Sequence, residues 1–154
     1  MELKKIASFQ VDHTKLERGM YLSRIDGDVV TWDLRMKKPN AEPVLPIAAI
    51  HTIEHLVATF LRSSERSGNI LYFGPMGCRT GCYLLTRGLS NLEAIALVRE
   101  AFEFMASFDG PIPGATAVEC GNWKEHDLPT ARKEAALYVP LLRGYGEERL
   151  QYAK

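Results

Sequence analysis

The segment from about Ile47 to Ser63 constrains the fold of this chain more than any other part of the sequence. Lys38–Pro46, which precedes it, holds three prolines and must be a loop. After the loop, apolar residues recur at the spacing of an amphipathic helix: Ile50, Ile53, Leu56, Val57, Phe60 and Leu61. The pattern therefore predicts a helix over about 47–63.

Strands are predicted on both sides of this helix. Residues 3–12 and 20–35 contain short β-branched and aromatic runs, which are typical of strands, and Asp26-Gly27-Asp28 is a turn between two of them. Ile70–Phe73 and Cys82–Thr86 form a second predicted pair, joined through a glycine-rich stretch that carries Cys78. The clearest single strand is Val29–Leu34.

Two further helices follow the strands. Ser90 or Asn91 is suited to cap a helix of about 92–107. A Gly/Pro loop then leads to a short extended piece ending at Cys120. Asp127 is suited to cap a last helix from Pro129 to about Leu137, before Pro140 interrupts it. Strand pairs among helices predict an α+β fold, with an antiparallel sheet packed against about three helices in a single domain.

The motif His51-Thr-Ile-Glu54-His55 lies on the first predicted long helix. Residues four apart on a helix share one face, about 6 Å apart along the axis, so two imidazoles there can reach one metal ion. Glu54 lies at the edge of the same face. H-x-x-E-H is the inverse of the zincin motif and a known metallohydrolase signature, so we expect a metallohydrolase-like arrangement.

A catalytic metal site usually has three protein ligands and one open position, so two histidines are not sufficient. Spacing alone does not choose the third ligand from the available thiols, imidazoles and carboxylates, among them Cys78, Cys82, Cys120, His13 and His126. Cys78 and Cys120 each lie beside a glycine, which permits the close backbone approach that sites use. Cys82 lies in a strand-like run and is interpreted as a small buried hydrophobic residue.

Composition limits the other classes of function. The chain has 154 residues, the size of one domain. Lys plus Arg equals Asp plus Glu at 19 each, which disfavours nucleic acid as a partner. No apolar run reaches the roughly 18 residues of a membrane span, and no signal peptide is recognised, so we expect no membrane association and a cytoplasmic location. Three cysteines in such a protein indicate metal binding or reactive thiols rather than a disulfide framework.

Several motifs, in order along the chain, resemble those of the S-ribosylhomocysteine lyase (autoinducer-2 synthase) family. The resemblance covers nearly all of residues 1–154, which would form a single domain of this family. The motifs are Ser8-Phe-Gln-Val-Asp-His13-Thr, Asp33-Leu-Arg35-x-x-x-Pro-Asn40, His51-Thr-Ile-Glu-His55-Leu, Pro75-Met-Gly-Cys78-Arg-Thr-Gly81, Pro111-Ile-Pro, Glu119-Cys120-Gly and His126-Asp-Leu128. Tyr72-Phe-Gly74 departs from the family pattern, which usually reads Asp-x-Ser, so that one carboxylate is absent or replaced.

The resemblance implies a role for each matching residue. One divalent metal ion per subunit would be held by His51, His55 and Cys120. Cys78 and Glu54 would be catalytic acid/base groups. The positions that would line the substrate pocket, some of them from the other subunit, are Ser8, His13 and Arg35. The family is a homodimer with active sites at the subunit interface, and its native metal is usually Fe(II), which Zn(II) or Co(II) can replace.

The implied reaction cleaves the thioether of the small molecule S-ribosylhomocysteine. Two carbonyl isomerisations and a β-elimination would yield homocysteine and 4,5-dihydroxy-2,3-pentanedione. The second product is the autoinducer-2 precursor, which connects the family with autoinducer synthesis, quorum sensing and the methyl cycle.

Three alternatives stay open. An H-x-x-E-H metallopeptidase would use Glu54 as a base and would hydrolyse peptides. A non-catalytic module would be stabilised by a structural metal site and would unfold when the metal is removed. A family member that has lost activity would bind metal without turnover.

Overall fold

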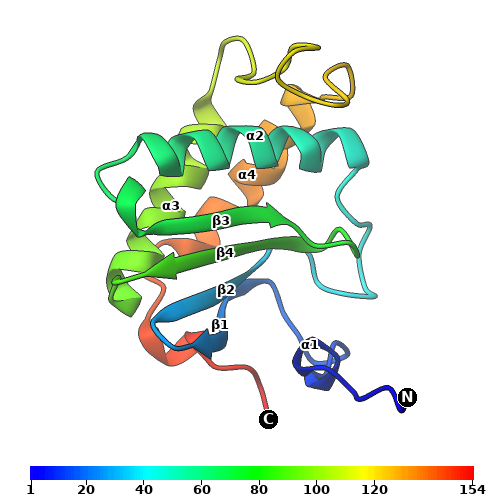
Figure 1. The fold of residues 1–154 in the computed structure, drawn as a ribbon, viewed down its shortest axis with the longest axis vertical. Helices are drawn as coiled ribbons and strands as arrows, with labels where there is room; N and C mark the ends of the chain where they lie inside the picture. The colour runs from blue at the N-terminus through cyan, green and yellow to red at the C-terminus, as the bar shows by residue number, and fades with distance from the viewer.

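A four-stranded antiparallel sheet in the order β1-β2-β4-β3 forms the centre of the computed structural model, which describes residues 1–154 (Figure 1). The strands are β1 (Gly19–Asp26), β2 (Val29–Arg35), β3 (Ile70–Pro75) and β4 (Gly81–Arg87). β1 and β2 are joined by the predicted turn, in which Gly27 adopts a φ of 62°. A positive φ is readily available to glycine, which explains the tight connection.

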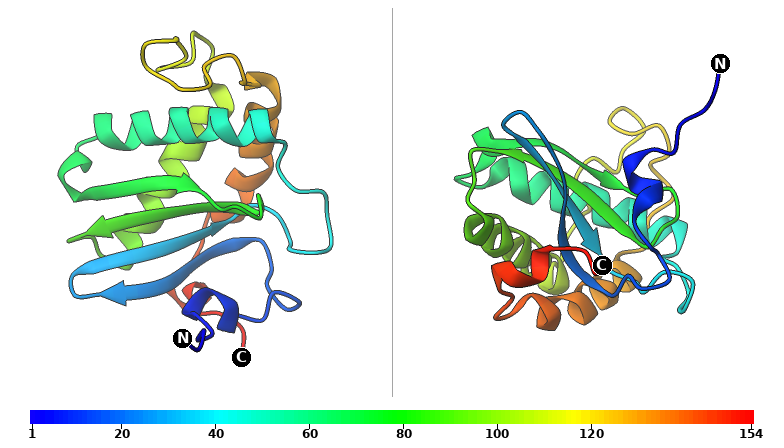
Figure 2. Two further views of the ribbon diagram at one scale, coloured as in Figure 1. Left: turned by 45° about the vertical axis from the view of Figure 1, so that its right-hand side comes forward. Right: turned by 90° about the horizontal axis from the view of Figure 1, so that it is seen from below.

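Three long helices cover one face of the sheet, and this confirms the predicted single-domain α+β fold (Figures 1 and 2). They are α2 (Ile47–Ser63), α3 (Asn91–Ser107) and α4 (Leu128–Leu142). The short α1 (Ala7–Gln10) belongs to an N-terminal segment that projects from the body (Figure 2). Two short 3₁₀ helices, Ser67–Asn69 and Glu147–Leu150, complete the structure. No helix has both the length and the apolarity needed to cross a membrane.

Local signals explain why α2 and α3 form where the sequence predicts them. α2 spans Ile47–Ser63 and buries its apolar stripe. α3 begins after a capping box, in which the Ser90 side chain accepts the backbone N–H of Glu93 and the Glu93 carboxylate accepts that of Ser90. Such a box satisfies two of the N–H groups that a helix start leaves unpaired.

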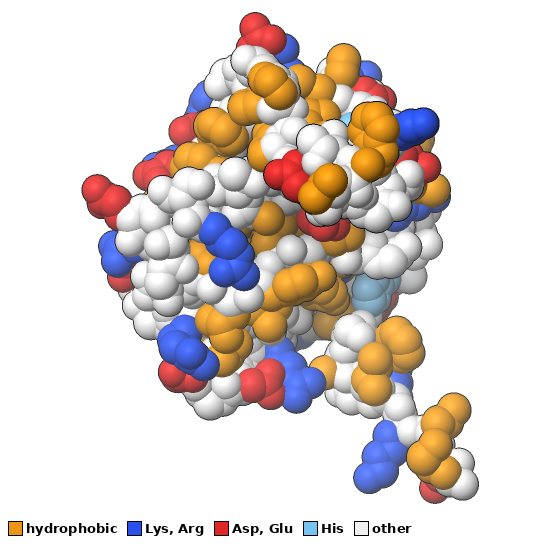
Figure 3. Space-filling model, turned by 45° about the horizontal axis from the view of Figure 1, so that its top comes forward, with side chains coloured by type: hydrophobic (Ala, Val, Ile, Leu, Met, Phe, Trp, Pro, Cys, Tyr) orange, Lys and Arg blue, Asp and Glu red, His pale blue; other side chains and the backbone are white.

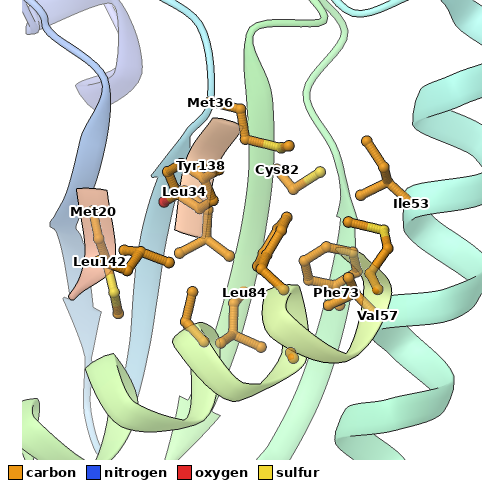
Figure 4. Close-up of a cluster of buried hydrophobic side chains, with 14 of the residues drawn as sticks. Met20, Leu34, Met36, Ile53, Val57, Phe73, Cys82, Leu84, Tyr138 and Leu142 are labelled. Atoms are coloured by element: carbon orange, nitrogen blue, oxygen red, sulfur yellow. The ribbon is translucent and has the colours of Figure 1, made fainter. Parts of the chain in front are cut away.

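The core lies between the sheet and the three long helices (Figure 4). Fully buried side chains come from every layer, including Leu34 and Leu84 from the sheet, Ile53 from α2 and Tyr138 from α4. Cys82 points into the same cluster with no exposed surface, which confirms its interpretation as a core residue. Burial raises the pKa of its thiol, with a further contribution from the negative charge of Glu54.

The predicted strand over residues 3–12 is wrong, because the only regular element there is the four-residue α1. β propensity is a weak local preference, and a strand forms only where a neighbour pairs with its backbone. The sheet ends at β1, so this segment has no partner within the chain. The prediction of a short extended piece before Cys120 is also wrong. The chain forms a turn there, with the N–H groups of Glu119 and Cys120 both donating to the carbonyl of Thr116.

The last helix is longer than predicted, since α4 begins at Leu128 and passes through Pro140 to Leu142. Proline lacks an N–H and normally kinks or ends a helix. Here buried side chains on both sides of Pro140 keep α4 against the core, among them Tyr138, Val139 and Leu142. The metallohydrolase-like arrangement expected from H-x-x-E-H is not borne out, because five residues of a helix do not determine the sheet on which the helix packs.

Candidate metal centre and active site

α2 places His51 and His55 one turn apart, with ring centroids 4.6 Å apart and planes at 89°. The Nδ1 atom of each ring lies 2.8 Å from a backbone carbonyl oxygen, that of Glu125 for His51 and that of Pro113 for His55. A carbonyl only accepts, so each Nδ1 carries the proton and each Nε2 retains a free lone pair. Metal-binding histidines are commonly oriented by this type of hydrogen bond.

The loop between α3 and α4 brings Cys120 and His126 to the same place. Ligand atoms of His51, His55, Cys120 and His126 all lie within 4.8 Å of one another, and all four residues are partly buried. Sγ of Cys120 lies 3.5 Å from Nε2 of His51. Tetrahedral bonds of about 2.3 Å to sulfur and about 2.0 Å to nitrogen would put two such atoms about 3.5 Å apart. This cluster could therefore hold one divalent transition-metal ion, for which imidazole and thiolate are suitable ligands.

His126 was only one of several candidate ligands in the sequence, and the structure places it inside the cluster. Its ring stacks on that of His51, with centroids 4.0 Å apart and planes at 17°. Burial lowers the pKa of His126, and the charges of His51 and His55 lower it further. Sequence reasoning missed Thr52, whose Oγ1 lies 3.0 Å from Nδ1 of His126 and accepts the backbone N–H of Asp127. A threonine among the apolar residues of α2 was the available signal.

The turn between β3 and β4 carries Cys78, whose side chain is exposed. Its Sγ lies 3.1 Å from Oγ1 of Thr80 and 4.0 Å from Nη1 of Arg35. A cavity of about 330 Å³ surrounds it. The lining residues are Ser8, Phe9, His13, Arg35, Pro75, Met76, Gly77, Cys78 and Tyr83. The structure thus brings the three predicted substrate-lining residues to Cys78, whereas no member of the His/Cys cluster lines this cavity.

A buried ion pair fixes Arg35 beside Cys78. The guanidinium binds the Asp33 carboxylate through two hydrogen bonds of 2.6 and 3.0 Å, and its Nη1 donates to Thr80 at 2.7 Å. Burial alone would lower the pKa of Arg35, but the charge and the hydrogen bonds of Asp33, with smaller contributions from Cys78 and Tyr152, together outweigh it and leave the pKa raised. The hydroxyl of Tyr152 donates to the same carboxylate at 2.7 Å. Sequence reasoning assigned no role to Thr80 or Tyr152, because only folding brings the C-terminal segment to β2.

Glu54 and Tyr72 complete the predicted features. Glu54 is half-buried on α2, one residue before His55. Tyr72 replaces the usual acidic residue of the resembled family and is 55% exposed on β3. Its ring covers Gly74, where an added Cβ would collide with the tyrosine hydroxyl. The two departures from the family pattern therefore fit each other sterically.

Comparisons with known proteins agree with this geometry. The family model for S-ribosylhomocysteinase (LuxS) matches residues 6–143. The S-ribosylhomocysteine lyases of Borreliella burgdorferi and Desulfotalea psychrophila are each 49% identical, covering 97% of this chain and 99% of the relative. That of Phocaeicola vulgatus is 50% identical over 143 residues, 89% of each chain. The chain belongs to the S-ribosylhomocysteinase (LuxS) family.

Proposed function

We propose that this protein, acting as one domain over residues 1–154, cleaves the thioether of S-ribosylhomocysteine to homocysteine and 4,5-dihydroxy-2,3-pentanedione. The observation that carries the proposal is the convergence of two histidines of α2 with Cys120 from a distant loop, in a chain that matches lyases along almost its whole length. A thiol as the third candidate ligand does not favour a metallopeptidase of the H-x-x-E-H type.

His51, His55 and Cys120 are the proposed ligands of one divalent metal ion per subunit. Their support is the free Nε2 lone pairs and the 3.5 Å between Sγ of Cys120 and Nε2 of His51. The proposed native metal is Fe(II), with Zn(II) or Co(II) as substitutes, since such donor sets accept several divalent ions. When bound, the metal would supply Lewis acidity that polarises a carbonyl oxygen.

The proposed chemistry moves the substrate carbonyl from C1 to C2 and then to C3 by proton transfers between adjacent carbons. Removal of the C4 proton then expels homocysteine from C5 as a thiolate, which takes up a proton. Cys78 and Glu54 are the proposed acid/base groups for these transfers, and such groups typically contribute factors of about 10²–10⁴. The contacts of Cys78 with Arg35 and Thr80 support this role, because they hold the thiol at the cavity.

The proposed active unit is a homodimer with its sites at the subunit interface. The cavity around Cys78 and the His/Cys cluster do not share a residue within one chain. The projecting N-terminal segment exposes apolar side chains, with Leu3 83%, Ile6 55% and Phe9 66% exposed (Figure 3). A second copy that covers this segment would complete the site, with Ser8, His13 and Arg35 as substrate-binding residues.

The proposed product is the precursor of autoinducer-2, which would connect the enzyme with autoinducer synthesis, quorum sensing and the methyl cycle. All three cysteines are free in the structure. Free thiols are expected of a reducing compartment, which supports a cytoplasmic location.

Thiol release tests the reaction directly. Protein loaded anaerobically with Fe(II) or Co(II) is mixed with S-ribosylhomocysteine, and free thiol is followed beside Cys78→Ala at equal metal content. Release by the wild type and not by the variant is expected. A folded, metal-loaded wild type that releases no thiol would refute the proposed function. A variant that releases thiol at the wild-type rate would refute only the role of Cys78.

A further inference from the structure

Nε2 of His126 is the only buried side-chain nitrogen or oxygen in the chain without a hydrogen-bond partner. A buried polar atom normally has one, and leaving it unpaired costs about 1–3 kcal/mol. The atom belongs to a ring that lies against both His51 and His55, with centroids 4.0 and 4.7 Å away. Its missing partner is therefore expected at the His/Cys cluster.

The opposite side of the ring is fixed by Thr52. Its hydroxyl donates to the carbonyl of Ala48 at 3.1 Å and accepts the N–H of Asp127 at 2.9 Å. A hydroxyl has one proton, and with that proton given to the carbonyl of Ala48 we assign Nδ1 of His126, 3.0 Å away, as the donor in their contact. In the neutral ring Nε2 is then an acceptor, and the group that it lacks is a donor such as a hydroxyl.

The stacking geometry argues against His126 as a metal ligand. An imidazole binds an ion in the plane of its own ring, along the lone pair of the nitrogen. The rings of His51 and His126 are nearly parallel at 17°, so an ion in one plane lies well outside the other. The ring of His55 stands at 89° to that of His51, and these two planes can meet at one ion.

We propose that His126 is a substrate-binding residue and not a metal ligand: its Nε2 accepts a hydrogen bond from a hydroxyl of the sugar at the cluster. The inference rests on the proposed function, because it takes a polyhydroxylated sugar as the ligand. The site offers only an acceptor at this point, so a deoxy or O-methylated sugar at the contacted position would lose the interaction.

The test compares His126→Asn with His126→Gln, both in the Cys78→Ala background so that substrate binds without turnover. Asparagine places an amide near the position of Nδ1 and leaves nothing at Nε2. Glutamine reaches the position of Nε2 with an amide oxygen. Metal content and the visible spectrum of the Co(II)-loaded proteins are measured first. Titration with S-ribosylhomocysteine, followed through the Co(II) absorption, then yields each Kd.

Unchanged metal content and an unchanged spectrum without substrate are expected for both variants. The Kd should rise about 5- to 30-fold in His126→Asn, the loss of one hydrogen bond, and by less in His126→Gln. Loss of metal, or a shifted spectrum without substrate, would make His126 a ligand and overturn the proposal. Equal Kd values in His126→Asn and its parent would also overturn it. If the Cys78→Ala parent binds S-ribosylhomocysteine tightly but the wild type releases no thiol, the lyase function is refuted and the proposed contact of His126 with the sugar is not.

Discussion

Replacing Thr52 by valine should weaken the fold, because one hydroxyl connects α2 to the start of α4. Valine keeps the branched shape of threonine and replaces the hydroxyl by a methyl group, which neither donates nor accepts a hydrogen bond. The backbone N–H of Asp127 and Nδ1 of His126 would then lose their partner, at 2.9 and 3.0 Å. A buried unpaired group costs about 1–3 kcal/mol, and both groups are only partly buried, so we expect about 1–3 kcal/mol in total.

Urea unfolding of the metal-free protein measures this loss without a contribution from metal binding. Thr52→Ser is the matched control, since it keeps the hydroxyl and removes a methyl group, at a cost of about 1 kcal/mol. Metal affinity, measured by competition with a chelator, should stay at the wild-type value, because the His126 ring that the Thr52 hydroxyl orients is not one of the proposed ligands. A valine variant as stable as the wild type would refute the assigned role of the Thr52 hydroxyl.

Three other substitutions have defined outcomes. Cys82→Ala should keep metal content and turnover and lose about 1 kcal/mol of stability by urea unfolding, because the thiol packs in the core; loss of metal would contradict the ligand assignment. Glu134→Ala removes the nearer carboxylate from the buried ammonium of Lys37, at 2.8 Å, and leaves only Glu42 at 3.9 Å, so it should cost up to about 3–5 kcal/mol by the same measurement. The hydrogen bond from Arg18 lowers the pKa of the Glu42 carboxyl below its ordinary 4.5. The ionised carboxylate therefore stabilises the folded protein fully above pH 4.5, and this contribution is lost as the pH falls through the lower pKa of the folded state. The stability difference between wild type and Glu42→Gln should therefore vanish in acid, and a constant difference down to pH 2 would refute this origin.

Elements with strong local signals were predictable from the sequence. α2 has a continuous apolar stripe after a proline-rich loop, and α3 has a capping box at Ser90. These signals act between residues a few positions apart, so they do not depend on the rest of the fold. Residues 3–12 and the helix beyond Pro140 were mispredicted, because a missing strand partner and a buried helix face are properties of distant parts of the chain.

The sequence by itself determined that His51 and His55 share one face of a helix, since this follows from helical geometry alone. Which thiol joins them does not follow from spacing, and the choice of Cys120 came from family resemblance. Only the tertiary structure decided that Cys120 and His126 meet α2 while Cys78 lies in a separate cavity. The physical reason is that the packing of α3 and α4 against α2 positions the loop that carries Cys120 and His126, whereas the pairing of β3 with β4 positions the turn that carries Cys78.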